Sequence, residues 1–248
     1  MNAYPKKIIP LIGDSLIGFT NAKDNEIILN RIVGKGYNCA KMDELLGINA
    51  QADQKYHNFE VKHGERIQAA LDLEAKRTEE MNYYTNDRKL AFHIFGGQQD
   101  LAVRSQLGID LSLKEGLNGF IEQAQQFYET ILKKKEILSR LDEFAMTAEK
   151  VQERLNGLTA LRVLFDILEV KKGLAAIALK ERTVSYNTLR VAWHKFKTVC
   201  LIVFAKKQEH LKLLNINPPA VRVRTNKRTS SKRSRTAEVK VEMPDDIE

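Results

Sequence analysis

The feature that most constrains the fold is a stretch of 207 residues, 11–217, that contains no proline. All five prolines lie outside it, at positions 5, 10, 218, 219 and 244. Loops of β-rich and α/β proteins ordinarily use proline, whereas helices exclude it because its ring removes a backbone donor and clashes with the preceding turn. An apolar content of 43% is ample for a core. The sequence therefore predicts an all-α fold.

The same stretch contains a repeat with an offset of 109 residues. Glu60-Val61-Lys62-His63-Gly64 returns as Glu169-Val170-Lys171-Lys172-Gly173. Twelve of 68 aligned positions, from Ile28 to Phe95, are identical, where about four are expected by chance. We interpret the chain as an internally duplicated helical bundle. Residues 1–109 and 110–217 form two repeats packed as one body, and residues 218–248 form a tail.

Each repeat is expected to begin with two short helices, over residues 12–22 and 27–33 in the first copy and 117–132 and 137–144 in the second. Asn38 and Thr147 then stand at the same register. Both are good N-caps because their side-chain oxygens accept hydrogen bonds from the free backbone amides of the first helical turn. We predict a long helix after each cap, closed by Gly108 or Asn215 in the left-handed conformation.

The second long helix carries an apolar stripe whose spacing alternates between three and four residues. Because a turn at Gly173 would reset its phase, we favour helices that continue through Gly64 and Gly173 in a coiled-coil-like seam. The alternative is a hairpin at each glycine, which would build a more compact bundle. Phe165 and Trp193 are expected in the core. Only Lys172 and Arg182 interrupt the apolar character of the stripe, which comprises Leu158, Leu161, Phe165, Leu168, Lys172, Ala175, Leu179, Arg182, Tyr186, Leu189, Trp193, Phe196, Cys200 and Val203.

Glu60 and His63 are the most suggestive ligand pair, since Glu-x-x-His on a helix is half of the di-metal site of some four-helix bundles. The second repeat has Glu169 and Lys172 there, and an ammonium group repels a metal ion. We therefore interpret both pairs as solvated charge and expect no cofactor, metal site or catalytic residue. An enzymatic or metal-binding bundle remains an alternative. The remaining histidines are read as surface or half-buried residues and the glycine pairs as helix ends: His57, His93, His194, His210, Gly34-Lys35-Gly36 and Gly96-Gly97.

The net charge of +8 is unevenly distributed, because residues 218–248 hold eight Lys/Arg and five Asp/Glu. No apolar period survives in this segment, which predicts a disordered tail. Its basic part could contact nucleic-acid phosphates without sequence specificity, or could simply aid solubility. The candidate contacts are Arg222, Arg224, Lys227, Arg228, Lys232, Arg233 and Arg235.

The cellular location is expected to be cytoplasmic. Cys39 and Cys200 are not repeat-related and predict no disulfide framework. No run reaches the ~18 apolar residues of a membrane helix. Pro10 and Asp14 interrupt the apolar run near the N-terminus, so we do not expect a signal peptide there.

The order of elements resembles an uncharacterised group of bacterial tandem-repeat, all-helical proteins over residues 10–217. In each repeat, short helices precede an Asn or Thr cap, a long helix with Glu-x-x-x-Gly at its middle, and an apolar run ending near Phe95 or Phe204. The resemblance implies a bacterial helical protein and brings no catalytic residues. The leading hypothesis is a non-enzymatic helical scaffold that binds a protein partner or itself, with no small-molecule ligand. Nucleic-acid association through the tail is the alternative.

Overall fold

The structure is a computed structural model that describes residues 5–217. This part of the chain contains helices and no strand, which confirms the all-α prediction. The elements in chain order are α1 (Pro5–Asp24), α2 (Glu26–Ile32), η1 (Val33–Lys35), α3 (Cys39–Ile94), η2 (Gln98–Asp100), α4 (Leu101–Leu107), α5 (Gly116–Lys133), α6 (Lys135–Asp142), α7 (Ala148–Val203) and α8 (Gln208–Leu213).

The long helices α3 and α7 each contain 56 residues and run unbroken through Gly64 and Gly173. At 1.5 Å per residue, each is about 84 Å long. A Cβ added at either glycine would meet no heavy atom within 4 Å. The predicted continuity is confirmed, and the hairpin alternative is wrong. Neither glycine is therefore required for close packing of α3 against α7.

Both long helices begin at the predicted caps. The side chain of Asn38 accepts a hydrogen bond from the amide of Lys41 at 2.9 Å, and that of Thr147 accepts one from the amide of Lys150 at 3.3 Å.

The helix ends agree only in part with the prediction: Gly96-Gly97 follows the end of α3, which confirms its interpretation as a helix end, but neither long helix reaches Gly108 or Asn215. α3 ends at Ile94 and α7 at Val203, and the short helices α4 and α8 follow as separate elements.

Other boundaries were predicted in part. Gly108 and Asn215 adopt the left-handed conformation as expected, with φ of 64° and 56°, although they close α4 and follow α8 instead of ending the long helices. α1 begins at Pro5 and contains Pro10, whereas the expected helix began at residue 12. Pro5 stands at the first helical position, where a missing amide costs nothing, whereas Pro10 lies beyond the first turn and removes one i→i−4 hydrogen bond.

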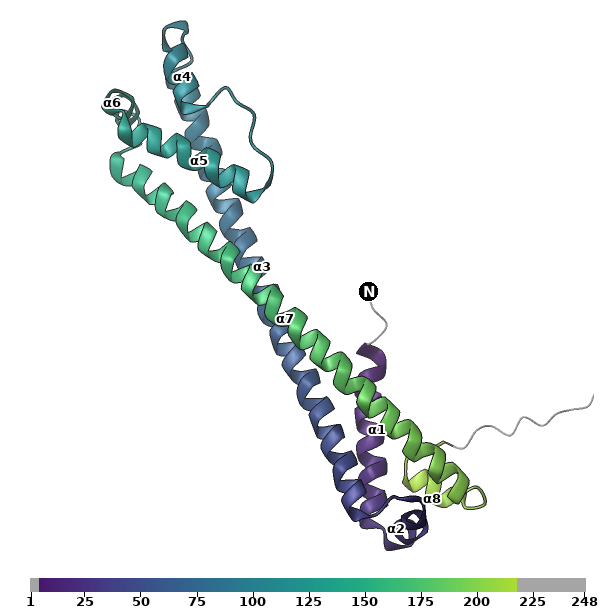
Figure 1. The fold of residues 1–248 in the computed structure, drawn as a ribbon. Coiled ribbons are helices and arrows are strands. Elements are labelled where there is room, and N and C mark those ends of the chain that lie inside the picture. Colours follow the sequence, from purple (N-terminus) through teal and green to yellow (C-terminus); the bar gives the residue numbers. More distant parts are fainter. Residues whose placement is uncertain (1–4, 218–248) are drawn as a thin grey trace, which may run out of the picture.

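The molecule is elongated, with a group of short helices at each end of the crossed α3–α7 pair (Figure 1). The two long helices run in opposite directions. α1, α2 and α8 gather at one end, and α4, α5 and α6 at the other. A hydrophobic core lies at each end.

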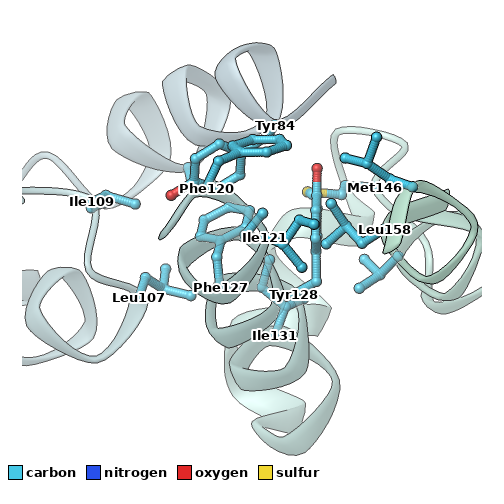
Figure 2. Close-up of a cluster of buried hydrophobic side chains, with 14 of the residues drawn as sticks. Tyr84, Leu107, Ile109, Phe120, Ile121, Phe127, Tyr128, Ile131, Met146 and Leu158 are labelled. Carbon is cyan, nitrogen blue, oxygen red and sulfur yellow. The ribbon is translucent and has the colours of Figure 1, made fainter. Parts of the chain in front are cut away.

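Each core combines residues of both predicted repeats. The core around α5 joins the C-terminal half of α3 to the N-terminal half of α7. There the ring of Tyr84 packs edge-on against Phe127 at 5.5 Å and Tyr128 at 6.2 Å (Figure 2). The core around α1 joins the other halves, and Trp193 packs edge-on against Phe19 at 5.5 Å. Each end therefore depends on both long helices.

The predicted stripe accounts for most of the buried face of α7. Leu158, Leu161, Leu168, Ala175, Arg182, Tyr186, Leu189, Trp193, Phe196 and Cys200 are buried. Phe165 and Val203 are partly buried, Lys172 is exposed, and Leu179 is 42% exposed. The unexpected member is Arg182, whose guanidinium carbon lies 3.9 Å from the centroid of the Phe59 ring. Its cation is thus covered by an aromatic face from α3.

Candidate interaction surface

The outer face of α7 carries a second apolar series, which we call the α7 stripe. Its side chains are large, aliphatic and between 40% and 62% exposed. They recur at steps of four and three residues, then at steps of seven. The members are Val163, Ile167, Val170, Leu174, Ile177, Val184 and Val191.

The stripe lies away from the body of the protein. At 100° per residue, its centre is about 150° around the helix from the buried face that holds Leu161, Leu168 and Leu189. One helix therefore has an apolar face toward α3 and another toward solvent. Exposed apolar residues scattered singly are ordinary, but a contiguous series along one face is typical of an interaction site.

The same face of α3 provides an internal comparison. The positions 109 residues earlier are Gln54, Asn58, Val61, Glu65, Gln68, Ala75 and Asn82. Only Val61 is a large apolar residue, and it is 58% exposed. The two long helices have the same length and N-cap side chains at equivalent positions. The apolar outer face is therefore a property of α7 and is not required by the helix pair.

Charged pairs border the stripe near its centre. Lys171 donates to Glu65 of α3 at 2.7 Å, and Lys62 donates to the same carboxylate at 3.0 Å. These hydrogen bonds, with that from Lys171 the larger cause, lower the pKa of Glu65. Glu181 lies between Ile177 and Val184 in the series, and its carboxylate is held by Lys55 at 2.8 Å. The ion pair draws this charge toward α3.

The residues of the predicted metal alternative are not assembled into a site. His63 stacks on the Phe59 ring, with centroids 5.4 Å apart, and Glu60 is exposed. In the second repeat, Lys172 donates to Glu169 at 2.7 Å. Within residues 5–217, no group of three or more His, Cys, Asp or Glu side chains could hold a metal ion.

Tyr128, Asp87 and Arg154 form a polar network beside the α5 core. The Tyr128 hydroxyl donates to Asp87 at 2.9 Å, and burial, followed by the nearby Asp87 charge, raises the pKa of Tyr128. Arg154 lies 3.4 Å from the same carboxylate and stacks over the Tyr83 ring at 3.6 Å. This network joins α3, α5 and α7. The Tyr84 hydroxyl, buried in the same core, has no hydrogen-bond partner among the residues that the structure describes.

The seven cations proposed as nucleic-acid contacts, from Arg222 to Arg235, lie outside the described residues. Their role remains a prediction from the sequence.

Sequence reasoning missed the α7 stripe because it followed the inward phase of this helix alone. The outward phase is also visible in the sequence. Val163, Val170, Ile177, Val184 and Val191 recur at intervals of seven, and each is β-branched. A search for a second heptad phase in the same helix would have found the stripe.

Comparison with protein-family models, with curated proteins and with solved structures finds no significant match to this chain. No helix among residues 5–217 combines the length and the hydropathy that crossing a membrane requires. A functional proposal must therefore start from the surface just described.

Proposed function

We propose that the protein is a non-enzymatic helical scaffold that binds a protein partner through the α7 stripe. The supporting observation is seven exposed aliphatic side chains in register on one face of α7. Removing such a face from water is favourable by about 25 cal/mol per Å². A series with coiled-coil spacing fits a helical partner best, because the knobs of one helix fill holes of the other.

The placement of the two cores at opposite ends of the α3–α7 pair is compatible with a scaffold. The cores at its ends lie on opposite sides of the central crossing, so the middle of α7 is held straight without being covered by a short helix (Figure 1). A surface presented in this way loses little conformational entropy on binding, because its backbone is already ordered.

We also infer that the body arose by duplication. Several features recur at the 109-residue offset: the bounds of α3 and α7, their caps, and the left-handed residues Gly36 and Ala145. The aromatic pair of Phe19 with Trp193 corresponds to that of Tyr128 with Tyr84. On this interpretation, one copy kept a polar outer face while the other gained the stripe.

The proposed function can be tested with a photoreactive amino acid placed at Val170 in the full chain in its native host. We expect a discrete covalent adduct after illumination, identified by mass spectrometry. Val61 is the matched control, because it is the same residue type, lies 109 positions earlier in α3 and is similarly exposed, at 58% against 62%. Equal adducts at both positions, or none at either, would count against an interaction through the α7 stripe.

A further inference from the structure

We infer that the α7 stripe is an interface between two copies of this chain. The two α7 helices pack antiparallel, and the two-fold axis passes at the level of Lys172 and Gly173 along the helix. This inference rests on the proposed function and names the partner. It is carried by the spacing of the stripe, by the charges on its flank, and by the open space around the axis.

The spacing indicates a coiled coil. One series is apolar at every seventh residue from Val163 to Val191, which is four heptads or about 42 Å of helix. The second series is apolar at Ile167 and Leu174 but polar at Glu181 and Thr188.

In a heptad, the d residue follows the a residue by three positions. Because Val170 follows Ile167 by three, Ile167 and Leu174 take the a position, and the β-branched residues from Val163 to Val191 take the d position. A parallel two-stranded coil favours the reverse arrangement, with β-branched residues at a and Leu at d. The stripe therefore disfavours a parallel dimer.

An antiparallel pair brings each a residue opposite a d residue. With the axis beside Lys172, Ile167 faces Ile177 of the second copy, and Val170 faces its Leu174. Two-fold symmetry repeats both layers, so the stripe is complementary to itself, as an isologous interface requires. In the next layer outward, Glu181 occupies the following a position and faces Val163 of the second copy, and Lys55 of its own chain holds the Glu181 carboxylate at 2.8 Å.

The charged residues that flank the stripe favour this register of the two helices. Asp166 and Lys180 are exposed beside the stripe on the same flank. In the register centred beside Lys172, Asp166 faces Lys180 of the second copy, and symmetry gives this attraction twice. Moving the axis one heptad toward the C-terminus would place Lys180 opposite itself. Flanking pairs of opposite sign set register and orientation in coiled coils.

The surroundings of the axis accept a second helix. Gly173 lies on the Asp166 flank, and no heavy atom lies within 4 Å of a Cβ placed on it, so the second backbone can approach closely there. On the other flank, the two Lys171 side chains face each other. Each is bound to Glu65 of its own chain at 2.7 Å, which offsets their repulsion.

Other occupants fit less well. Of the seven α3 positions equivalent to the stripe, only Val61 is a large apolar residue, so this face of α3 does not complement the stripe. Residues 218–248 of the same chain contain no apolar residues at alternating spacings of three and four. A second copy supplies complementary apolar layers between Ile167 and Ile177 and two Asp166–Lys180 pairs.

The test is the mass of the purified full chain by sedimentation velocity over a range of concentrations. We expect a concentration-dependent shift from 28.3 kDa to twice that mass. Val170→Glu should weaken dimerisation by at least roughly tenfold, because it buries two unpaired charges per dimer. Val61→Glu is the control and should leave dimerisation unchanged. Circular dichroism should be the same for all three proteins, as both sites are exposed.

The orientation is tested by oxidation in a Cys39→Ser background. Ile167→Cys combined with Ile177→Cys should form an interchain disulfide, whereas Ile177→Cys alone should not. A parallel dimer would give the opposite result for the single variant and would overturn the assigned register. A chain that stays at 28.3 kDa, or a dimer equally insensitive to both glutamates, would overturn the inference. If the Val170 photo-adduct then contained a different protein, the proposed function would stand without self-association.

Discussion

At the scale of single residues, Gly18 and Gly64 show how differently two helical glycines can be used. A Cβ on Gly18 would lie 2.6 Å from two atoms of the Trp193 ring and 2.9 Å from the carbonyl oxygen of Leu214. A Cβ on Gly64 would touch nothing within 4 Å. The first glycine is required by packing in the α1 core, and the second is not.

We therefore expect substitution by alanine to have opposite effects on the free energy of unfolding. Gly64→Ala should stabilise the protein by about 0.5–1 kcal/mol, because alanine is the better helix former. Gly18→Ala should destabilise it by about 1–3 kcal/mol, because a buried ring or a backbone segment must move. Denaturant unfolding at one fixed protein concentration measures both. A loss of stability in Gly64→Ala would show that its surroundings are closed.

The two thiols should differ in reactivity. Cys39 is exposed, whereas Cys200 is fully buried in the α1 core, and burial raises the pKa of Cys200 to about 12. The thiolate is the reactive form. We expect one thiol per native chain to react with a disulfide reagent at pH 8, and two in denaturant. Cys39→Ser should lower both counts by one; a native count of one in that variant would place Cys200 within reach of solvent.

At the scale of the helices, Trp193 and Phe165 belong to the same predicted inward-facing apolar series of α7 but are buried to different degrees. Trp193 is 8% exposed, and its ring contacts Phe196 of the same helix and Phe19 of α1, so it packs α7 against α1. Phe165 is only partly buried beside the α5 core. We expect Trp193→Ala to cost about 3–5 kcal/mol of unfolding free energy. Phe165→Ala should cost clearly less, and equal losses in denaturant unfolding would show that α7 is packed evenly along its length.

The helices were largely predictable because their signals are local. Proline exclusion, the caps at Asn38 and Thr147, and the unbroken phase through Gly173 each specify backbone conformation within a few turns. The end of α3 was marked by Gly96-Gly97, which was read as a helix end, whereas nothing in the sequence pattern predicted the break after Val203 that separates α8 from α7.

The candidate site was harder to predict, because its definition depends on what α3 leaves uncovered. A sequence with two apolar phases in one helix does not say which phase faces the body. The buried position of Arg182 was unpredictable for a similar reason, since its cation needs the Phe59 ring of another helix. Pairings between distant helices become visible only once their crossing is known.

At the scale of the whole molecule, few residues are buried in the middle of the α3–α7 pair, between the two cores. No residue of α3 from 53 to 68 is buried. On α7, the buried residues of this region include Ala175 and Ala178, which belong to neither core cluster. Polar pairs such as Lys171 with Glu65 complete the contact. Partly exposed ion pairs contribute little stability, so the crossing depends on the ends for its order.

The nucleic-acid alternative makes its own prediction. If the seven cations from Arg222 to Arg235 contact phosphates, affinity for double-stranded DNA should fall with salt with a logarithmic slope of up to about −6. A chain ending at residue 217 should lose this binding. A chain ending at residue 235 keeps the cations without the acidic segment and should bind more tightly. Unchanged binding by the shortest chain would place any nucleic-acid site elsewhere.

The sparsely buried middle of the α3–α7 pair makes self-association detectable by hydrogen exchange. Amides in the middle of α3 and α7 should exchange through local opening, because few buried contacts oppose it there. The inferred dimer covers residues 160–184 of α7 and adds contacts that must break before those amides open. Peptides from this segment should therefore exchange more slowly at a protein concentration above the sedimentation midpoint than below it. Residues 51–75 of α3 are the matched control and should change less. Val170→Glu should remove the concentration dependence, and slowing of equal size in both segments would mean that association acts on the whole crossing and not through the outer face of α7.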